Sequence, residues 1–306
     1  MNIVRRSRPL LLALWVSVFV ACAGAQPQPK SQSYEPRVGQ QGKDVVWVPT
    51  PQELVDKMLD MAKVTPKDYL IDLGSGDGRT VIAAAKRGLR AHGIEYNADM
   101  VELSKSNAAK AGVSDKATFA KADLFESDFS EAQVITMFLL PQINLKLRPK
   151  ILDLKPATRI VSNSFTMAEW EADESATVGG ECDHWCTALL WIVPAKVEGT
   201  WQLPQGELSL KQTFQMLSGT IKTGNSAAQI SNGKMIGDQI VFTAGGNQYT
   251  GRVNGNVMEG KSGSGSWKAT RLNSVNGFNR SNFQRSDRLQ SSMFKLRSRK
   301  IQCGGE

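Results

Sequence analysis

Residues 69–78 read Tyr-Leu-Ile-Asp-Leu-Gly-Ser-Gly-Asp-Gly, and this stretch decides the fold. A buried apolar run ends in an acid, Asp72, and a helical pattern then begins at Arg79 and stops at Gly88. Between the apolar run and the helical pattern, glycines occupy alternate positions: Gly74, Gly76 and Gly78. The stretch predicts a strand, a tight turn and a helix. Such a turn lets a ligand approach the backbone, and the helix N-terminus offers N–H groups to an anion.

Two further predicted strands also carry an acid at their ends. The second strand ends in Glu95, and the third, over residues 119–125, contains Asp123. In an open parallel sheet, ligands bind at the carboxyl ends of the strands. The second acid suits two ribose hydroxyls, and the third suits an adenine amino group. Because the glycine spacing is G-x-G-x-G and not the dinucleotide G-x-G-x-x-G, the pattern favours S-adenosylmethionine over NAD.

At these motifs the chain resembles the class I S-adenosylmethionine-dependent methyltransferases. It is similar to the bacterial relatives of the mitochondrial lysine methyltransferases that act on the ATP synthase c subunit and the adenine nucleotide translocase. The stretches that carry the likeness are residues 48–51, 72–79, 123–125 and 139–144. The resemblance implies S-adenosylmethionine as cofactor and the following binding residues: Thr50, Asp72, Gly74, Ser75, Gly76, Gly78, Glu95, Asp123 and Leu124.

The apolar run over residues 134–140 predicts a fourth buried strand, and the end of this strand is a candidate acceptor pocket. Its residues are Phe138, Leu140, Pro141 and Asn144, and Phe138 stands where the similar family usually has a tyrosine. Apolar walls would lower the pKa of a lysine amine. The alternative is that these side chains are buried core, and the sequence leaves both open. No Asn-Pro-Pro-Tyr motif for base amines occurs there.

The formal net charge of +8 is concentrated at the two ends of the chain. Residues 1–30 hold four basic and no acidic residues, and residues 271–306 hold eight basic and two acidic ones. A net charge of −2 is left for residues 31–270. The charge distribution therefore does not indicate a specific nucleic-acid partner.

The N-terminus predicts export. A basic start with Arg5, Arg6 and Arg8 precedes an uncharged, mostly apolar run over residues 10–21, and a small-residue cleavage site follows at residues 23–25. This pattern predicts a signal peptide and a location in the periplasm or cell envelope. A lipid anchor at Cys22 and an uncleaved membrane anchor are the alternatives. S-adenosylmethionine is made in the cytosol, so the cofactor motif and the export signal point to different compartments.

Patterning along the chain predicts five segments. They are a signal peptide (1–25), a linker (26–44), a class I methyltransferase domain (45–196), a small antiparallel β domain (197–270) and a basic, disordered tail (271–306). The methyltransferase domain is predicted as a Rossmann-like, doubly wound α/β sheet of seven strands with an antiparallel edge. Its first helix is predicted to begin at Pro51, with Thr50 as N-cap and Glu53 completing a capping box.

The predicted β domain alternates apolar and polar residues over 207–215, with Phe214 on the apolar side. Turns are expected at Asn232-Gly233, Gly245-Gly246 and Asn254-Gly255. A sandwich and a partial barrel both fit this pattern. With few titratable side chains, the domain is expected to serve as an accessory or partner-binding module.

Cys182 and Cys186 flank a short turn that also contains His184. A disulfide is the favoured interpretation in an exported chain, ahead of two free thiols. Zinc comes last because the cluster offers three ligands and structural sites need four. We therefore predict no metal.

The sequence thus predicts an S-adenosylmethionine-dependent methyltransferase with a protein acceptor, a lysine amine being favoured. The alternative is a non-enzymatic exported envelope protein that retains the scaffold and works through its β domain. The sequence does not determine the oligomeric state.

Overall fold

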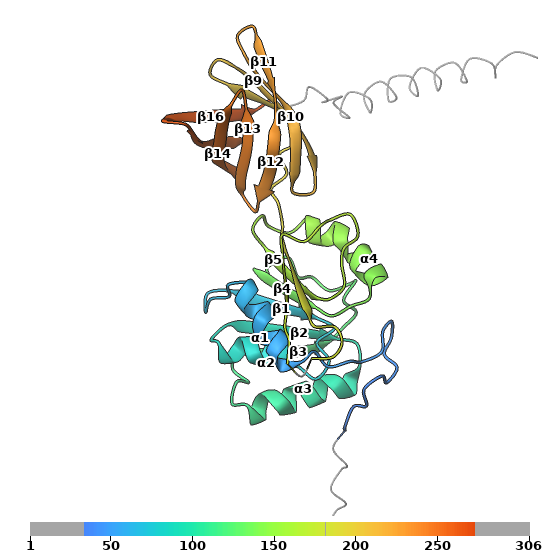
Figure 1. Ribbon diagram of the computed structural model, residues 1–306. Helices are drawn as coiled ribbons and strands as arrows, with labels where there is room; N and C mark the ends of the chain where they lie inside the picture. Colours follow the sequence, from blue (N-terminus) through green and yellow to red (C-terminus); the bar gives the residue numbers. More distant parts are fainter. Residues whose placement is uncertain (1–33, 181, 273–306) are drawn as a thin grey trace, which may run out of the picture. The chain divides into compact units, whose positions relative to one another are not determined.

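The computed structural model describes residues 34–180 and 182–272 (Figure 1). The predicted signal peptide, the start of the predicted linker and the predicted tail from residue 273 lie outside the described residues. Within them the chain forms a seven-stranded and a nine-stranded sheet. No helix in the described part of the chain is long and apolar enough to cross a membrane.

The first sheet alternates strands and helices until its last three strands. In chain order its elements are α1 (Gln52–Met61), β1 (Tyr69–Leu73), α2 (Arg79–Lys86), β2 (Arg90–Glu95), α3 (Ala98–Lys110), β3 (Ala117–Lys121), β4 (Val134–Met137), α4 (Pro141–Leu152), β5 (Arg159–Asn163), β6 (Glu174–Thr177) and β7 (Thr187–Ile192). The strand order is β3-β2-β1-β4-β5-β7-β6. β1 to β5 are parallel, and β7 is antiparallel to both of its neighbours. The predicted doubly wound sheet with an antiparallel edge is confirmed.

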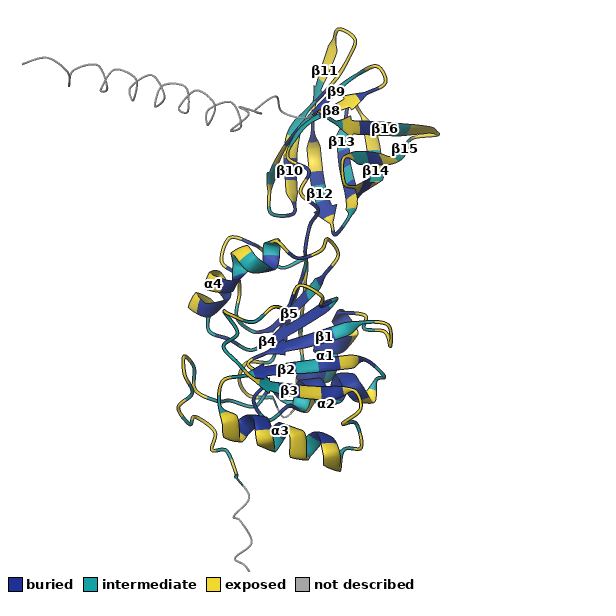
Figure 2. Ribbon diagram, turned by 180° about the vertical axis from the view of Figure 1, so that it is seen from behind, coloured by how far each residue is buried: buried dark blue, intermediate teal, exposed yellow. Residues whose placement is uncertain are grey.

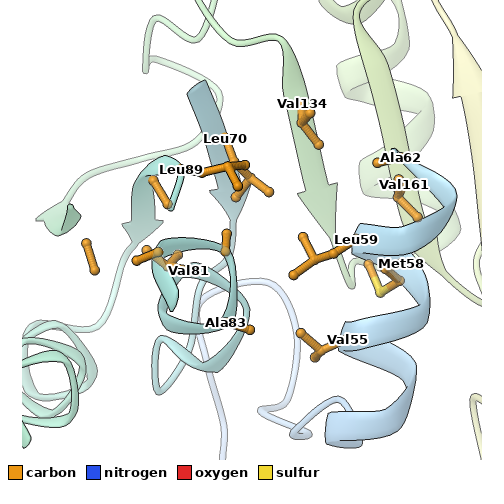
Figure 3. Close-up of a cluster of buried hydrophobic side chains, with 14 of the residues drawn as sticks. Val55, Met58, Leu59, Ala62, Leu70, Val81, Ala83, Leu89, Val134 and Val161 are labelled. Carbon is orange, nitrogen blue, oxygen red and sulfur yellow. The ribbon is translucent and has the colours of Figure 1, made fainter. Parts of the chain in front are cut away.

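Both faces of the central strands are buried, which is why these strands read as continuous apolar runs. Successive residues of a strand point to opposite faces. Leu70 belongs to the cluster that packs under α1, α2 and α3, and its neighbour Ile71 to the cluster under α4. Figure 2 shows β1 and β4 as almost wholly buried, and Figure 3 shows Leu70 and Val134 in the first cluster beside Leu59 of α1.

The first helix begins one residue later than predicted. α1 starts at Gln52 with Pro51 in the N-cap position, and no side chain caps it, so the predicted capping box is wrong. Two long-range bonds hold Thr50 instead. Its carbonyl oxygen accepts from Arg79 Nη1 at 2.8 Å, and its Oγ1 accepts from Asn163 Nδ2 at 3.4 Å. These bonds direct the Thr50 side chain toward the carboxyl edge of the sheet.

Two strands end earlier than predicted. β3 ends at Lys121, opposite Glu95, because Asp123 starts a turn in which its Oδ1 accepts from the Phe125 amide at 2.9 Å. β4 ends at Met137, where its pairing with both neighbours stops. Residues 138–140 therefore form a loop that leads into α4. Both corrections place the candidate site residues on loops.

The second sheet is a barrel, so the sandwich alternative is wrong. Its strands are β8 (Gly199–Leu203), β9 (Gly206–Thr213), β10 (Met216–Thr223), β11 (Ser226–Gln229), β12 (Ser231–Ile236), β13 (Gln239–Ala244), β14 (Asn247–Asn254), β15 (Val257–Ser262) and β16 (Gly265–Arg271). The order β11-β10-β12-β13-β14-β15-β16-β8-β9 closes on itself because β9 also pairs with β10. Closure removes most of the unpaired strand edge.

The turn predictions for the barrel hold at two of three places. Gly245-Gly246 joins β13 to β14, and Asn254-Gly255 lies between β14 and β15, as predicted. Asn232-Gly233 instead lies inside β12, where the pairing with β13 is irregular. A Cβ on Gly233 would lie 2.5 Å from the Leu217 carbonyl oxygen, so close approach of β10 explains this glycine.

Phe214 does not continue the inward pattern of the barrel. It sits in the turn between β9 and β10 at φ 53°, and its ring stacks on Trp170 with 6.0 Å between centroids. Next to it, Gln215 Nε2 donates to the Glu171 carbonyl oxygen at 2.9 Å. The β9–β10 turn is therefore bound to the loop that follows β5.

Part of the predicted linker is folded. Gln41 and Val46 form a bridge, and the Gly39 amide donates to the Trp47 carbonyl oxygen at 2.8 Å. Residues from Pro36 onward belong to one compact unit of the chain. The hairpin over residues 39–47 thus differs from the unstructured connection expected there.

Leu59 tests the packing of the first face. Its side chain is fully buried, so Leu59→Ala should lower the free energy of unfolding by about 2–5 kcal/mol through lost burial and a cavity. Leu145→Ala on α4 is the control, because that leucine is 38% exposed, and it should change stability by less than about 1 kcal/mol. Urea unfolding of the purified protein measures both. Equal effects would contradict this packing.

Candidate active site

A cavity of about 350 Å³ lies at the carboxyl ends of the parallel strands. Most of the residues predicted for the cofactor line it, namely Thr50, Asp72, Gly74, Ser75, Glu95, Asp123 and Leu124. Gly76 and Gly78 are not part of its lining. The structure therefore brings residues from four separate segments to one hollow. Three of these segments follow parallel strands, whose carboxyl ends meet at one edge of the sheet.

All three glycines of the loop adopt left-handed backbone conformations, with φ 79° at Gly74, 54° at Gly76 and 82° at Gly78. Only Gly74 faces the cavity. A Cβ on Gly76 would lie 2.7 Å from Trp47 Nε1, and one on Gly78 would lie 2.8 Å from the Phe119 ring. The second and third glycines are thus explained by packing, which corrects their expected place beside the ligand.

Glu95 is held by two backbone amides. Its Oε2 accepts from the Gly76 amide and its Oε1 from the Asn97 amide, each at 2.9 Å. A carboxylate oxygen can accept more than one hydrogen bond, so both oxygens keep capacity for a ligand. Asn97 also caps α3 by accepting from the Asp99 amide at 2.9 Å. The carboxylate is therefore oriented before any ligand arrives.

Asp72 is a buried carboxyl group at the end of β1. Its side chain accepts from Thr136 Oγ1 at 2.7 Å. Burial raises the pKa of Asp72 to about 7, and the negative charges of Glu95 and Asp77 act in the same direction. A cation bound beside Asp72 would favour its ionised form and so would be attracted there.

Asp123 is paired with a lysine from the predicted linker. Lys43 Nζ lies 2.5 Å from Asp123 Oδ2 and 4.7 Å from the centre of the Tyr96 ring. The hydrogen bond from Lys43 lowers the pKa of Asp123. Lys43 and Tyr96 both line the cavity, and the sequence analysis missed both. A ligand that uses this carboxylate must share it with Lys43 or displace it.

The candidate acceptor residues separate into two groups. Phe138 and Leu140 line the cavity. Pro141 is exposed at the first position of α4, and Asn144 is buried behind the lining. Asn144 Nδ2 donates to the carbonyl oxygens of Phe165 and Thr166, both at 3.2 Å. Asn144 therefore supports the loop that carries Phe165, and neither it nor Pro141 walls the pocket.

Two aromatic residues that the sequence analysis missed complete this end of the cavity. Phe165 follows β5, and Trp185 lies in the turn before β7. A disulfide joins Cys182 to Cys186 and closes the turn around Trp185, which agrees with the favoured interpretation of the two cysteines. Neither ring lies near Phe138 in sequence, so local patterning held no signal for their meeting.

Residues 72–174 match the ANTKMT methyltransferase domain. A protein-lysine N-methyltransferase from Saccharolobus islandicus is 42% identical to the chain over 153 residues, which cover 94% of that protein and 49% of this one. The chain belongs to the ANTKMT methyltransferase family. It is an S-adenosylmethionine-dependent methyltransferase, as predicted.

Two further comparisons each cover about half of this methyltransferase. The human lysine N-methyltransferase of the ATP synthase c subunit is 34% identical over 162 residues, covering 48% of this chain and 69% of the human protein. The crystal structure of an RNA methyltransferase from Salinibacter ruber, in complex with S-adenosyl-L-homocysteine, is 45% identical, with a TM-score of 0.46. That comparison covers 49% of this chain and 96% of the other.

The lining of this methyltransferase fits S-adenosylmethionine. Glu95 offers acceptor sites suited to the ribose hydroxyls, and Leu124 offers apolar surface to the adenine. Ser75 lies in the same lining, and its Oγ is buried with no hydrogen-bond partner among the described residues. Asp72 lies in the same lining and suits the positive charge of the cofactor.

Glu95 should contribute strongly to cofactor affinity. Glu95→Ala removes the oriented carboxylate and should weaken binding by about 10- to 150-fold, the equivalent of roughly 1.5–3 kcal/mol for charge-assisted bonds. Glu102→Ala on the exposed face of α3 is the control and should leave affinity within about twofold. Calorimetry with S-adenosylmethionine measures both. Unchanged affinity in folded Glu95→Ala protein would place the ribose elsewhere.

Asp72 should make stability depend on pH. Its pKa is raised from 3.8 to about 7, so the folded protein holds a proton there that the unfolded chain has lost. The contribution of Asp72 to stability is therefore fully present below about pH 4 and falls as pH rises to about 7, by up to roughly 1.4 kcal/mol per unit. Asp72→Asn should remove this slope, and exposed Asp115→Asn should not. Urea unfolding between pH 4.5 and 7.5 measures it, and equal slopes would contradict it.

Proposed function

We propose that this methyltransferase transfers a methyl group to a lysine side chain of a protein. The observation that carries the proposal is how the lining of one cavity is distributed along the strand order β3-β2-β1-β4-β5. Asp72, Glu95 and Asp123 lie at or just after the ends of β1, β2 and β3, which we call the polar end, and Phe138, Leu140 and Phe165 follow the adjacent β4 and β5, which we call the apolar end. The relatives named as lysine methyltransferases in Saccharolobus islandicus and human support this acceptor.

When bound, S-adenosylmethionine supplies the methyl group, and a C–N bond to the amine forms as the C–S bond breaks and the electron pair stays on sulfur. The protein must therefore present the amine in its neutral form and in line with that bond. An apolar wall disfavours the ammonium form and lowers the pKa of a lysine. Lowering it from ~10.4 to ~7.5 corresponds to roughly 4 kcal/mol.

The apolar end is suited to this task. Leu140 is half-buried, and the rings of Phe138 and Phe165 stack with 5.8 Å between centroids. The carboxylates of the lining lie on other segments: in β1 and the glycine loop, at the end of β2, in the turn after β3 and in the 39–47 hairpin. A lysine that lies against these rings thus meets apolar surface, and its proton passes to solvent.

A nucleic-acid acceptor is the competing class. One similar solved structure is named an RNA methyltransferase. The net charge of residues 31–270 argues against this acceptor. It is −2, whereas proteins that bind the phosphate backbone of nucleic acids are ordinarily basic. The proposal therefore commits to protein, and RNA is an outcome of the test.

We propose in addition that the chain works outside the cytosol, in the periplasm or cell envelope. The basic start and the apolar run over residues 10–21 support this, and so does the Cys182–Cys186 disulfide, because disulfides persist in oxidising compartments. Fractionation of cells that produce the full chain tests the location. Recovery of the protein and its intact disulfide from the cytosolic fraction would overturn it.

Leu140 tests the acceptor. Leu140→Asp places a charge in the apolar end and should reduce turnover by at least about 100-fold while cofactor affinity changes by less than about threefold. Leu145→Asp on the exposed side of α4 is the matched control and should keep near-normal turnover. Wild-type turnover should rise with pH as the amine loses its proton.

Tritium transfer from labelled S-adenosylmethionine to fractionated cell extract identifies the acceptor class. We expect label in protein and, after hydrolysis, in methylated lysine. Label in RNA, DNA or a small molecule, with none in protein, would overturn the lysine assignment.

A further inference from the structure

Three aromatic rings from separate segments meet at the apolar end of the cavity. Phe138 follows β4, Phe165 follows β5, and Trp185 lies between β6 and β7. The Phe138 and Phe165 rings lie 5.8 Å apart with 20° between their planes. The Trp185 ring lies 6.0 Å from Phe138, tilted by 60°. All three belong to the lining, so the rings form an angled wall that faces one space.

Trp185 is held in place by the disulfide loop, residues 182–186. The bond between Cys182 and Cys186 closes this loop, and the Val178 amide donates to the Cys186 carbonyl oxygen at 2.9 Å. Directly after the loop, the Thr187 carbonyl oxygen accepts from the Ser164 amide at 2.7 Å. The loop is thus bonded to the segment that carries Phe165, and this fixes one ring relative to the other.

Two features of Trp185 are energetically unfavourable for a tryptophan. Its backbone is left-handed, with φ 56°, and its side chain is 44% exposed. A left-handed conformation is unfavourable for a bulky residue, and water around an exposed indole adds to the free energy. Packing alone does not explain this position, because 44% of the side-chain surface is not covered by other residues.

We infer that Phe138, Phe165 and Trp185 bind the lysine nitrogen once it carries one to three methyl groups, and that Trp185 thereby determines the degree of methylation. This inference rests on the proposed lysine acceptor, and it additionally specifies how many methyl groups the product lysine carries. Aromatic faces attract cations, and they do so best when the cation carries little water. Each added methyl group removes an N–H group while the charge of the ammonium form stays.

The wall discriminates between methylated and unmethylated lysine because it offers no hydrogen-bond acceptor to an N–H group. Phe138 and Phe165 have no polar side-chain atom, and Trp185 has one N–H donor and no acceptor. An unmethylated ammonium has three N–H donors and loses hydrogen bonds on leaving water for this wall, whereas a trimethylammonium has none to lose. The rings therefore favour methylated lysine.

Preferential binding keeps a partly methylated lysine at the site between rounds. In each round the nitrogen loses one proton to solvent and gains one methyl group. After the third round the nitrogen is quaternary and has no proton to lose, so the reaction stops. Loss of the Trp185 ring should release the lysine early and leave products with one methyl group.

The test uses Nα-acetyl-lysine N-methylamide carrying zero or three side-chain methyl groups as a binding probe for the full protein. Trp185→Ala should weaken binding of the trimethylated probe by about 2- to 30-fold and change binding of the unmethylated probe by less than about twofold. Trp185→Phe should restore most of the difference. Ile236→Ala removes an equally exposed side chain from the barrel and should change neither.

Mass spectrometry of the labelled protein fraction then gives the ratio of mono-, di- and trimethylated lysine. We expect Trp185→Ala and the double variant Cys182→Ser, Cys186→Ser to shift this ratio toward monomethyl-lysine, with S-adenosylmethionine affinity unchanged. An unchanged ratio in folded Trp185→Ala protein, or equal weakening for both probes, would overturn the inference and leave lysine transfer standing. Label confined to nucleic acid or small molecules would instead overturn the proposed function.

Discussion

The site depends on how the glycine loop is bonded to the end of β2. The amides of Gly74 and Ser75 both donate to the Ile94 carbonyl oxygen, at 2.9 and 3.1 Å, and the Gly76 amide donates to Glu95. These bonds require the left-handed turn that glycine permits. They bring Asp72 and Glu95, which end neighbouring strands, into one lining. Without them the loop could not orient the Glu95 carboxylate in the cavity lining beside the buried Asp72.

Burial explains why the two ends of the cavity differ in chemistry. At the polar end, Asp72 keeps one strong hydrogen bond, from Thr136, and its raised pKa reflects the surrounding apolar sheet. At the apolar end, residues 138–140 leave the sheet before α4 begins, which frees Phe138 and Leu140 to line a cavity that strand residues would have filled. An early strand end thus creates the space that the proposed acceptor needs.

Local patterning predicted most of the sheet and part of the site. Asp72, Glu95 and Gly74 lie where the strand–turn–helix motif places them, because backbone geometry between neighbouring residues sets that motif. Predictions failed where a distant partner acts. Thr50 bonds to Arg79 and Asn163 and caps no helix, and Gly233 lies inside a strand because β10 approaches it closely. Asn144 supports the Phe165 loop from behind the cavity.

The sequence by itself determined the fold class, the cofactor motif and the family, since apolar periodicity, glycine spacing and strand-end acids are local properties of the chain. Only the tertiary structure decided which side chains share the cavity. Lys43 reaches Asp123 across 80 positions, and Trp185 meets Phe138 through a loop closed by a disulfide. Such contacts depend on loop conformations between strands, and a loop is shaped by what it packs against and not by its own periodicity.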